Sequence, residues 1–240
     1  MRIEQKAGFL VDFVRDVSRG GLVPAAFQRP YVWRVPDVLA LCNSIQEGFP
    51  IGSFLLWTPY GKADMTSVGR RRLGPIEVAG DNPHASMLLD GQNRLATLAW
   101  MMRDETVELP QDLSEAEDEV WGGSQRLVVD LSARSIDFVA KDEAAVGFKL
   151  PARVLLDRKV QMQLTRECWA TSWAPLPEAE KDAGLKWLDE VTNTFYDARV
   201  VATSLEHASA AEAKRAFLHI CKVGVPMSAA DFDAAIAWAL

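Results

Sequence analysis

Five consecutive residues, Asp90-Gly91-Gln92-Asn93-Arg94, combine a carboxylate, a glycine, two amides and a guanidinium where a buried strand is expected to run directly into a helix. The first turn of a helix has unpaired backbone N–H groups and a partial positive charge, so it attracts anions such as phosphate. Gly91 allows a ligand oxygen to approach the backbone, and Arg94 offers a planar set of donors suited to phosphate. The segment therefore predicts an anion-binding site.

A purely structural role also explains these residues. Asp90 is suited to cap the N-terminus of the helix, and Gln92 and Asn93 are suited to a solvated first turn. At about 100° per residue, Arg94 falls at the edge of the buried face. From there its side chain reaches a cleft without being buried, so the motif alone leaves both interpretations open.

A second cluster, residues 24–33, places glutamine, arginine and large aromatic side chains on a segment stiffened by two prolines. Tyr31 and Trp33 are candidates to stack on a base, and Gln28 and Arg29 to bind a phosphate or a base edge. For the aromatic residues, core packing is the alternative. The cluster predicts ligand contacts beside the first motif.

A third segment, Gly48-Phe49-Pro50-Ile51-Gly52, connects an expected helix to an expected strand. Two glycines around a proline are typical of a turn. They also let a backbone loop approach a ligand, which makes Gly52 a candidate binding residue.

The elements that must position these segments alternate between helix and strand. Helical spacing predicts a first helix over residues 5–17 and a second from Pro36 to Gly48. Strands are expected at 53–57 and 87–89, the latter leading into a helix over 91–103, and a hairpin at 127–131 and 135–139. From about residue 150 the pattern is mostly helical, with one strand at 199–205 and two final helices. The fold class is therefore α+β, with a mixed core over 1–140 and a mainly helical lobe over 141–240, packed as one unit.

In order and spacing, the three segments resemble the N-terminal domain of GmrSD-type restriction enzymes, a ParB/sulfiredoxin-like family with a DGQQR motif. The matching stretches are residues 27–33, 49–52 and 90–94, with a further family-like stretch at 216–220 and 224–228. The resemblance spans about residues 5–238. It implies a ParB/sulfiredoxin-like core for the α+β fold.

The resemblance also implies a nucleoside triphosphate ligand with Mg²⁺, and hydrolytic or nucleolytic activity in restriction of modified DNA or in sensing of phage. By position, the predicted catalytic residues are Asp90, Gln92 and Arg94, and Asp90 is also the predicted Mg²⁺ ligand. The predicted nucleotide-binding residues are Gln28, Arg29, Tyr31, Gly52, Gly91 and Asn93.

Three departures from the family pattern weaken the transfer of function to this chain. Asn93 replaces the usual second glutamine, and Cys221-Lys222-Val223-Gly224 replaces a stretch that usually has an asparagine and a glycine-rich turn. The chain also ends at Leu240 without a nuclease domain. The altered 221–224 stretch and the missing nuclease domain favour a non-catalytic switch or scaffold that binds nucleotide or DNA and works with a separate nuclease subunit, docked on a C-terminal helix over 229–240. The retained Asp90 and Arg94 favour hydrolysis.

Composition excludes several classes of protein. Lys and Arg total 26 against 33 Asp and Glu, a net charge of -7, which argues against indiscriminate coating of DNA. The arginines at 70–72 are either a local DNA contact or a solvated run. Three unpaired cysteines and three dispersed histidines form no zinc or HNH-type motif. No signal peptide or membrane span is apparent, so a cytoplasmic location is expected.

Overall fold

The computed structural model describes residues 1–25, 30–59, 72–78, 82, 84–144 and 146–222. A five-stranded mixed sheet forms its centre, in the order β1-β10-β3-β6-β2. The five strands are β1 (Arg2–Phe9), β2 (Leu22–Pro24), β3 (Ser53–Pro59), β6 (Ser86–Asp90) and β10 (Arg199–Ala208). β10 runs antiparallel to β1 and parallel to β3, and β6 runs antiparallel to β3 and parallel to β2. The predicted α+β class is confirmed.

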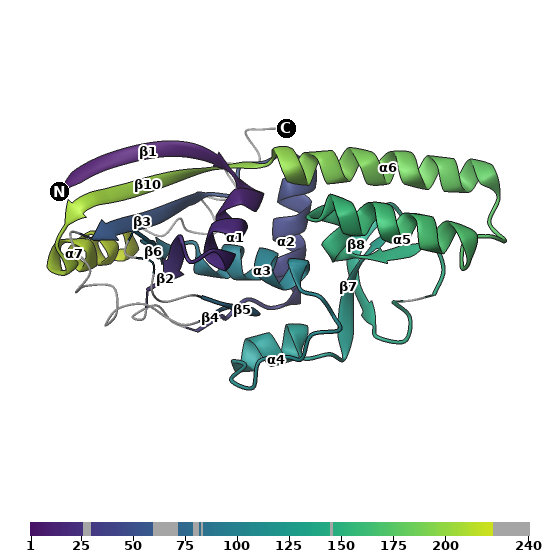
Figure 1. The fold of residues 1–240 in the computed structure, drawn as a ribbon, viewed down its shortest axis with the longest axis horizontal. Coiled ribbons are helices and arrows are strands. Elements are labelled where there is room, and N and C mark those ends of the chain that lie inside the picture. The colour runs from purple at the N-terminus through teal and green to yellow at the C-terminus, as the bar shows by residue number, and fades with distance from the viewer. Residues whose placement is uncertain (26–29, 60–71, 79–81, 83, 145, 223–240) are drawn as a thin grey trace, which may run out of the picture.

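Helices lie on both sides of this sheet and extend beyond one end of it (Figure 1). They are α1 (Leu10–Ser18), α2 (Val35–Gln46), α3 (Gln92–Met102), α4 (Glu115–Trp121), α5 (Arg158–Ala170), α6 (Glu178–Asp197) and α7 (Ala210–Lys222). The shorter strands β4 (Arg72–Leu73) and β5 (Ile76–Glu77) pair with each other. In a three-stranded sheet, β7 (Gln125–Asp130) lies between β8 (Ser135–Ala140) and β9 (Lys149–Pro151). A 3-10 turn at Ala152–Leu155 follows β9 in the chain. Among the described residues, no helix is long and apolar enough to cross a membrane.

At β3 both faces of the central sheet are buried, and successive side chains point to opposite faces. On β3, Phe54 and Leu56 join the main core with α1, α2 and α3, whereas Leu55 and Trp57 face a smaller core closed by α7. β10 alternates in the same way and lies between β1 and β3. The C-terminal part of the chain thus supplies a strand to the sheet of the N-terminal part.

The predicted first helix over residues 5–17 is wrong in its first half. Residues up to Phe9 form β1, which pairs with β10 over its whole length, and α1 begins only at Leu10. The helical spacing holds from Leu10 to Val17, where the buried face lies. β1 is mostly exposed, so its sequence lacks the alternation that marks a half-buried strand.

Most of the other predicted elements are confirmed. α2 begins at Val35 with Pro36 in its first turn and ends before Gly48, whose φ is +72°. β6 leads into α3, and β7 and β8 form the predicted hairpin. The sequence interpretation missed α4, although Ser114 and Glu117 form a capping box that is visible in the sequence. The second of the two final helices, expected over 229–240, lies outside the described residues.

The buried thiol of Cys42 on α2 makes the free energy of unfolding depend on pH in the alkaline range. Burial raises the pKa of Cys42 from 9.0 to about 12. The unfolded chain therefore loses this proton first, and stability that is complete below pH 9 is lost as the pH rises toward 12. We expect this group to lower the free energy of unfolding by about 1.4 kcal/mol per pH unit in that window.

Urea unfolding at several pH values within this window measures that slope. Cys42→Ala should lower stability at neutral pH and reduce the slope, whereas Cys168→Ala, at a partly exposed position on α5, should leave the slope intact. An unchanged slope in Cys42→Ala would contradict the assignment.

Candidate functional site

Gly91 joins β6 to α3 in a left-handed conformation, with φ of +98°. A Cβ atom at this position would lie 2.7 Å from Cε1 of Phe54 and closer still to Cδ1. Both the backbone conformation and the space therefore require glycine. The N-cap of α3 is Gly91, which has no side chain to cap the helix, and Asp90 lies before it. The structural alternative for Asp90, helix capping, is thus wrong.

The Arg94 side chain holds the loop before β3. Nη1 donates to the carbonyl oxygen of Ile51 at 2.6 Å, and Nη2 donates to that of Ser53 at 2.8 Å. The guanidinium also lies 5.4 Å from the centre of the Phe54 ring and 3.5 Å from Oδ2 of Asp90. Burial lowers the pKa of Arg94, and the Asp90 carboxylate opposes this shift. Arg94 thus joins the 90–94 motif to the 48–52 segment.

Gly52 completes this contact from the other side. Its φ is +88°, and a Cβ atom there would collide with Nη1 of Arg94. The predicted binding role of Gly52 stays a prediction. The structure shows that the backbone of this loop packs closely against the Arg94 side chain.

The segment after Pro30 packs against the same helix. The Val32 N–H donates to Oδ1 of Asn93 at 3.3 Å, and the hydroxyl groups of Tyr31 and Thr97 lie 2.9 Å apart. Tyr31 is only 4% exposed, and burial raises its pKa to about 12. Its ring therefore packs in the core, which is the alternative left open for the aromatic residues, and is not available for a base in this conformation. Gln28 and Arg29 lie outside the described residues.

Two polar groups remain available at the start of α3. The Asp90 side chain is 54% exposed, at the end of β6. The amide oxygen of Gln92 is buried, and the described residues provide it with no hydrogen-bond partner. A carboxylate, an unpaired amide and the uncapped N–H groups of the first turn therefore lie together. This arrangement suits an anionic ligand that also carries a hydrogen-bond donor or a bound water.

Asp90 is the carboxylate at this site that would hold Mg²⁺. Elsewhere in the described part of the chain, no group of three or more His, Cys, Asp or Glu side chains is placed to hold an ion. Mg²⁺ commonly binds through one or two carboxylates, water and substrate phosphates. The residues therefore fit Mg²⁺ that arrives with a triphosphate, and do not form a cage built from protein ligands alone.

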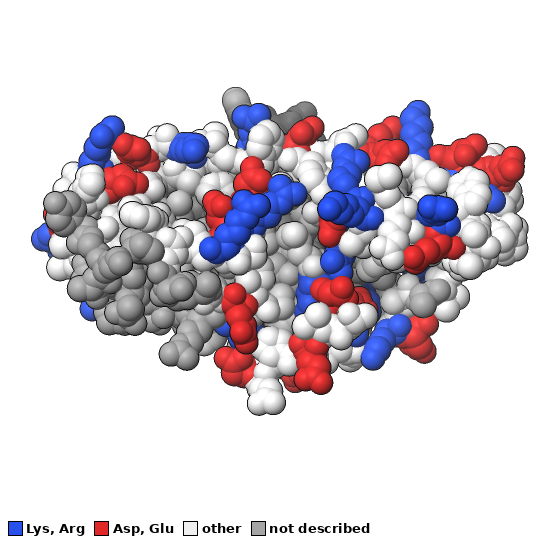
Figure 2. All heavy atoms as spheres, in the orientation of Figure 1, with Lys and Arg blue, Asp and Glu red and all other residues white. Residues whose placement is uncertain are grey.

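The arginine run at 70–72 is partly explained by structure. Nη1 and Nη2 of Arg72 donate to the two carboxylate oxygens of Glu117 at 2.9 and 3.0 Å. The Glu117 side chain is 5% exposed, so this ion pair is internal. Arg72 thus anchors β4 to α4, and Arg70 and Arg71 lie outside the described residues. On the face shown in Figure 2, basic and acidic side chains are interspersed.

Phe54 was not identified from the sequence as part of the site. It contacts Gly91 and Arg94 because it points toward α3 from β3, one residue after the loop that Arg94 holds. In the sequence, Phe54 was recognisable only as one residue of the strand expected at 53–57. Thr97 was missed for a similar reason, because a threonine within a helix does not reveal that its hydroxyl group has a tyrosine partner.

Comparison with known proteins identifies the family to which the chain belongs. A family model described as "GmrSD restriction endonuclease, N-terminal domain" matches residues 10–236, which include every segment of the site. No curated protein matched the chain. Because the match covers nearly the whole chain, the suspected resemblance is confirmed. The chain belongs to the family of GmrSD restriction endonuclease N-terminal domains.

Proposed function

We propose that this chain is the nucleoside-triphosphate-binding and hydrolysing component of a restriction or phage-defence system. The observation that carries the proposal is the start of α3, where first-turn N–H groups without a side-chain cap at Gly91, the exposed Asp90 and the Gln92 amide oxygen, which has no partner among the described residues, lie together. Helix N-termini of this kind bind phosphate. Membership of a restriction endonuclease family supports the biological setting.

Each residue has a distinct role in this proposal. The N–H groups of the first turn bind phosphate oxygens, and Gly91 allows the turn from β6 into α3 that exposes them. Arg94 positions the loop before β3, because both of its outer nitrogens already donate to carbonyl oxygens. Gln92 orients the attacking water with its free amide oxygen. Asp90 would hold Mg²⁺ together with the phosphates, and the ion supplies charge neutralisation when bound.

Hydrolysis at this site is the attack of water on the terminal phosphorus. A bond forms from the water oxygen to phosphorus, the bond to the bridging oxygen breaks, and the products are a nucleoside diphosphate and inorganic phosphate. Asp90, half exposed at the end of β6, accepts the proton of the water or passes it to solvent. This role agrees with the absence of a capping bond from Asp90.

A test begins with the melting temperature of the chain in ATP, GTP, CTP and UTP, each with Mg²⁺. A ligand at about 100 times its Kd stabilises the folded state by about 2.7 kcal/mol, so a bound nucleotide should raise the melting temperature clearly. Phosphate release is then measured for the nucleotide that binds. Asp90→Asn should keep most of the thermal shift and lose release, whereas Asp182→Asn, exposed on α6, should keep both.

The outcomes separate two functions. Binding with no phosphate release supports a non-catalytic switch that acts through a separate nuclease, an alternative favoured by the engagement of Arg94 with the 51–53 backbone. Release that survives Asp90→Asn removes Asp90 from the mechanism. No shift with any of the four nucleotides would refute the proposal for this chain.

A further inference from the structure

A cavity of about 690 Å³ lies at the opposite end of α3 from the site described above. Its walls come from the end of α3, the turn at 103–106, α4, β7, β9 and α5. The eleven residues of α3 separate it from Gly91 by about 16 Å, at 1.5 Å per residue. Small-molecule sites typically have volumes of about 300–1,000 Å³. The cavity is thus large enough for a ligand and distinct from the start of α3.

Positive charge gathers around this cavity although the chain as a whole is acidic. The described lining residues include two carboxylates, Asp104 and Glu105, and five cationic side chains: Arg103, Arg126, Lys141, Lys149 and Arg153. The lining thus carries more cations than carboxylates in a protein with a net charge of -7, and Asp130 and Asp157 outside the lining balance Lys149 and Arg153 in part.

Three of these cations have carboxylate partners. Arg126 pairs with Glu105 at 2.9 Å, Arg153 with Asp104 at 2.8 Å, and Lys149 with an oxygen of Asp130 at 3.9 Å. Within the described part of the chain, Arg103 and Lys141 form no ion pair with a carboxylate. These two residues are therefore the cations available to an added anion.

Arg103 has an incomplete set of hydrogen bonds among the described residues, and the charges of Glu105 and Asp104 only partly offset the lowering of its pKa. Its Nη2 donates to the carbonyl oxygen of Val107, but its Nε is buried without a partner, as is the Nε of Arg153. Burial and the neighbouring Arg126 both lower the pKa of Arg103. Buried donors without acceptors are destabilising, and an anion in the cavity would relieve this.

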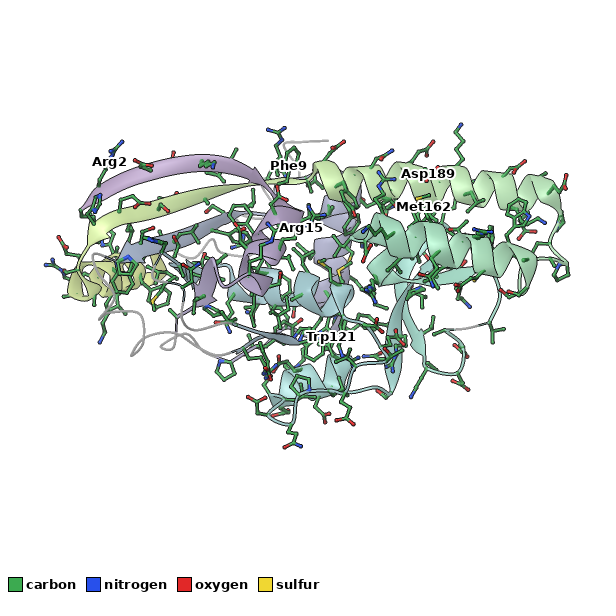
Figure 3. All side chains as sticks on the ribbon, viewed as in Figure 1. Arg2, Phe9, Arg15, Trp121, Met162 and Asp189 are labelled. Carbon is green, nitrogen blue, oxygen red and sulfur yellow. The ribbon has the colours of Figure 1, made fainter. Side chains whose placement is uncertain are left out.

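The remaining wall of the cavity is apolar. Leu150 of β9 and Val160 and Leu164 of α5 line it, together with Trp121, which lies between α4 and the body of the molecule (Figure 3). Trp121 is stacked on Trp100, with ring centres 5.9 Å apart and planes within 7°. This support makes the wall rigid and suited to the flat body of a ligand.

We propose that this cavity binds an organic phosphate of nucleotide size, with its phosphate toward Arg103 and Lys141 and its flat body against Trp121 and Leu164. The site is separate from the triphosphate site at the start of α3 and does not depend on the function proposed there. The protein would then bind a small phosphate ester in this cavity as well as a nucleoside triphosphate at the start of α3.

Adenosine monophosphate and inorganic phosphate are the probes, titrated calorimetrically into the full chain at low ionic strength. AMP should bind one per chain and more tightly than phosphate, since only AMP contacts the apolar wall. Lys141→Glu at an exposed position should weaken AMP binding at least about tenfold, because charge-assisted bonds contribute about 1.5–3 kcal/mol. Lys214→Glu on α7 makes the same change of charge outside the cavity. It should change the affinity for AMP by less than about twofold.

Cys168, which lines the cavity, locates the ligand independently. AMP should slow its alkylation by iodoacetamide, measured by mass spectrometry of the peptide, while buried Cys42 stays unmodified as a control for unfolding. AMP that binds without protecting Cys168, or with equal affinity to Lys141→Glu, overturns the proposal. Absence of AMP binding, or phosphate binding as tightly as AMP, also overturns it.

Discussion

Gly91→Ala is expected to lower the free energy of unfolding by about 3 kcal/mol and to remove any nucleotide binding at the start of α3. The φ of +98° is unfavourable for any side chain, and strain of this kind amounts to about 1–2 kcal/mol for alanine. The Cβ atom would also collide with the ring of Phe54, and forced overpacking adds about 1–3 kcal/mol. Urea unfolding measures the sum.

Gly48→Ala is the matched control for this prediction. Gly48 has a φ of +72°, but nothing lies within 4 Å of a Cβ atom built there. This variant therefore reports the strain alone, with an expected loss of about 1 kcal/mol. Equal losses of unfolding free energy for the two variants would show that the Phe54 ring moves aside freely. The close packing of Gly91 against Phe54 would then not contribute to stability.

Glu117→Ala is expected to lower the free energy of unfolding by about 3 kcal/mol, since it removes the buried partner of Arg72 and leaves, among the described residues, only the exposed Asp112 to balance that charge. Glu117 accepts bonds from both outer nitrogens of Arg72, from the Trp100 indole at 3.3 Å and from the Ser114 N–H at 3.0 Å. The Trp100 indole and the Ser114 N–H would lose this acceptor, and Arg72 would keep, in the described part of the chain, only Asp112 and the Gly74 carbonyl oxygen. Thermal or urea unfolding measures the loss.

Glu115→Ala, in the same helix, provides the comparison. The Glu115 side chain is 91% exposed and pairs with Arg34 at 3.3 Å. Exposed pairs contribute little, so the expected loss is below about 1 kcal/mol. A loss for Glu117→Ala no larger than that for Glu115→Ala would mean that water replaces the missing carboxylate, and that the link between β4 and α4 is not buried in solution.

The sequence was most informative where a local pattern determines the structure. The proline in the first turn of α2 and the continuous apolar run of β6 were both sufficient. β1 could not be predicted in this way, because its pairing with β10 depends on residues about 200 positions away and its side chains are exposed. Helical spacing between Leu10 and Val17 was real, and its extension backward to Gln5 was the error.

The site shows the same limit. The sequence pointed to the segments 24–33, 48–52 and 90–94, and the structure brings the described part of all three together at the start of α3. The role of Arg94 was not predictable, because its partners are backbone carbonyl oxygens of Ile51 and Ser53, which any residue type supplies. Whether a guanidinium faces a ligand or its own chain depends on tertiary packing.

The position of β10 between β1 and β3 has a consequence for how the protein is made. Arg2 lies opposite Glu206, so the first strand synthesised has no partner until almost all of the described chain has left the ribosome. Contacts of such long sequence separation slow folding and leave strand edges exposed meanwhile. β3 also lacks its parallel neighbour until then. A nascent chain or a fragment that stops near residue 140 holds the whole 90–94 motif but only an incomplete sheet to support it.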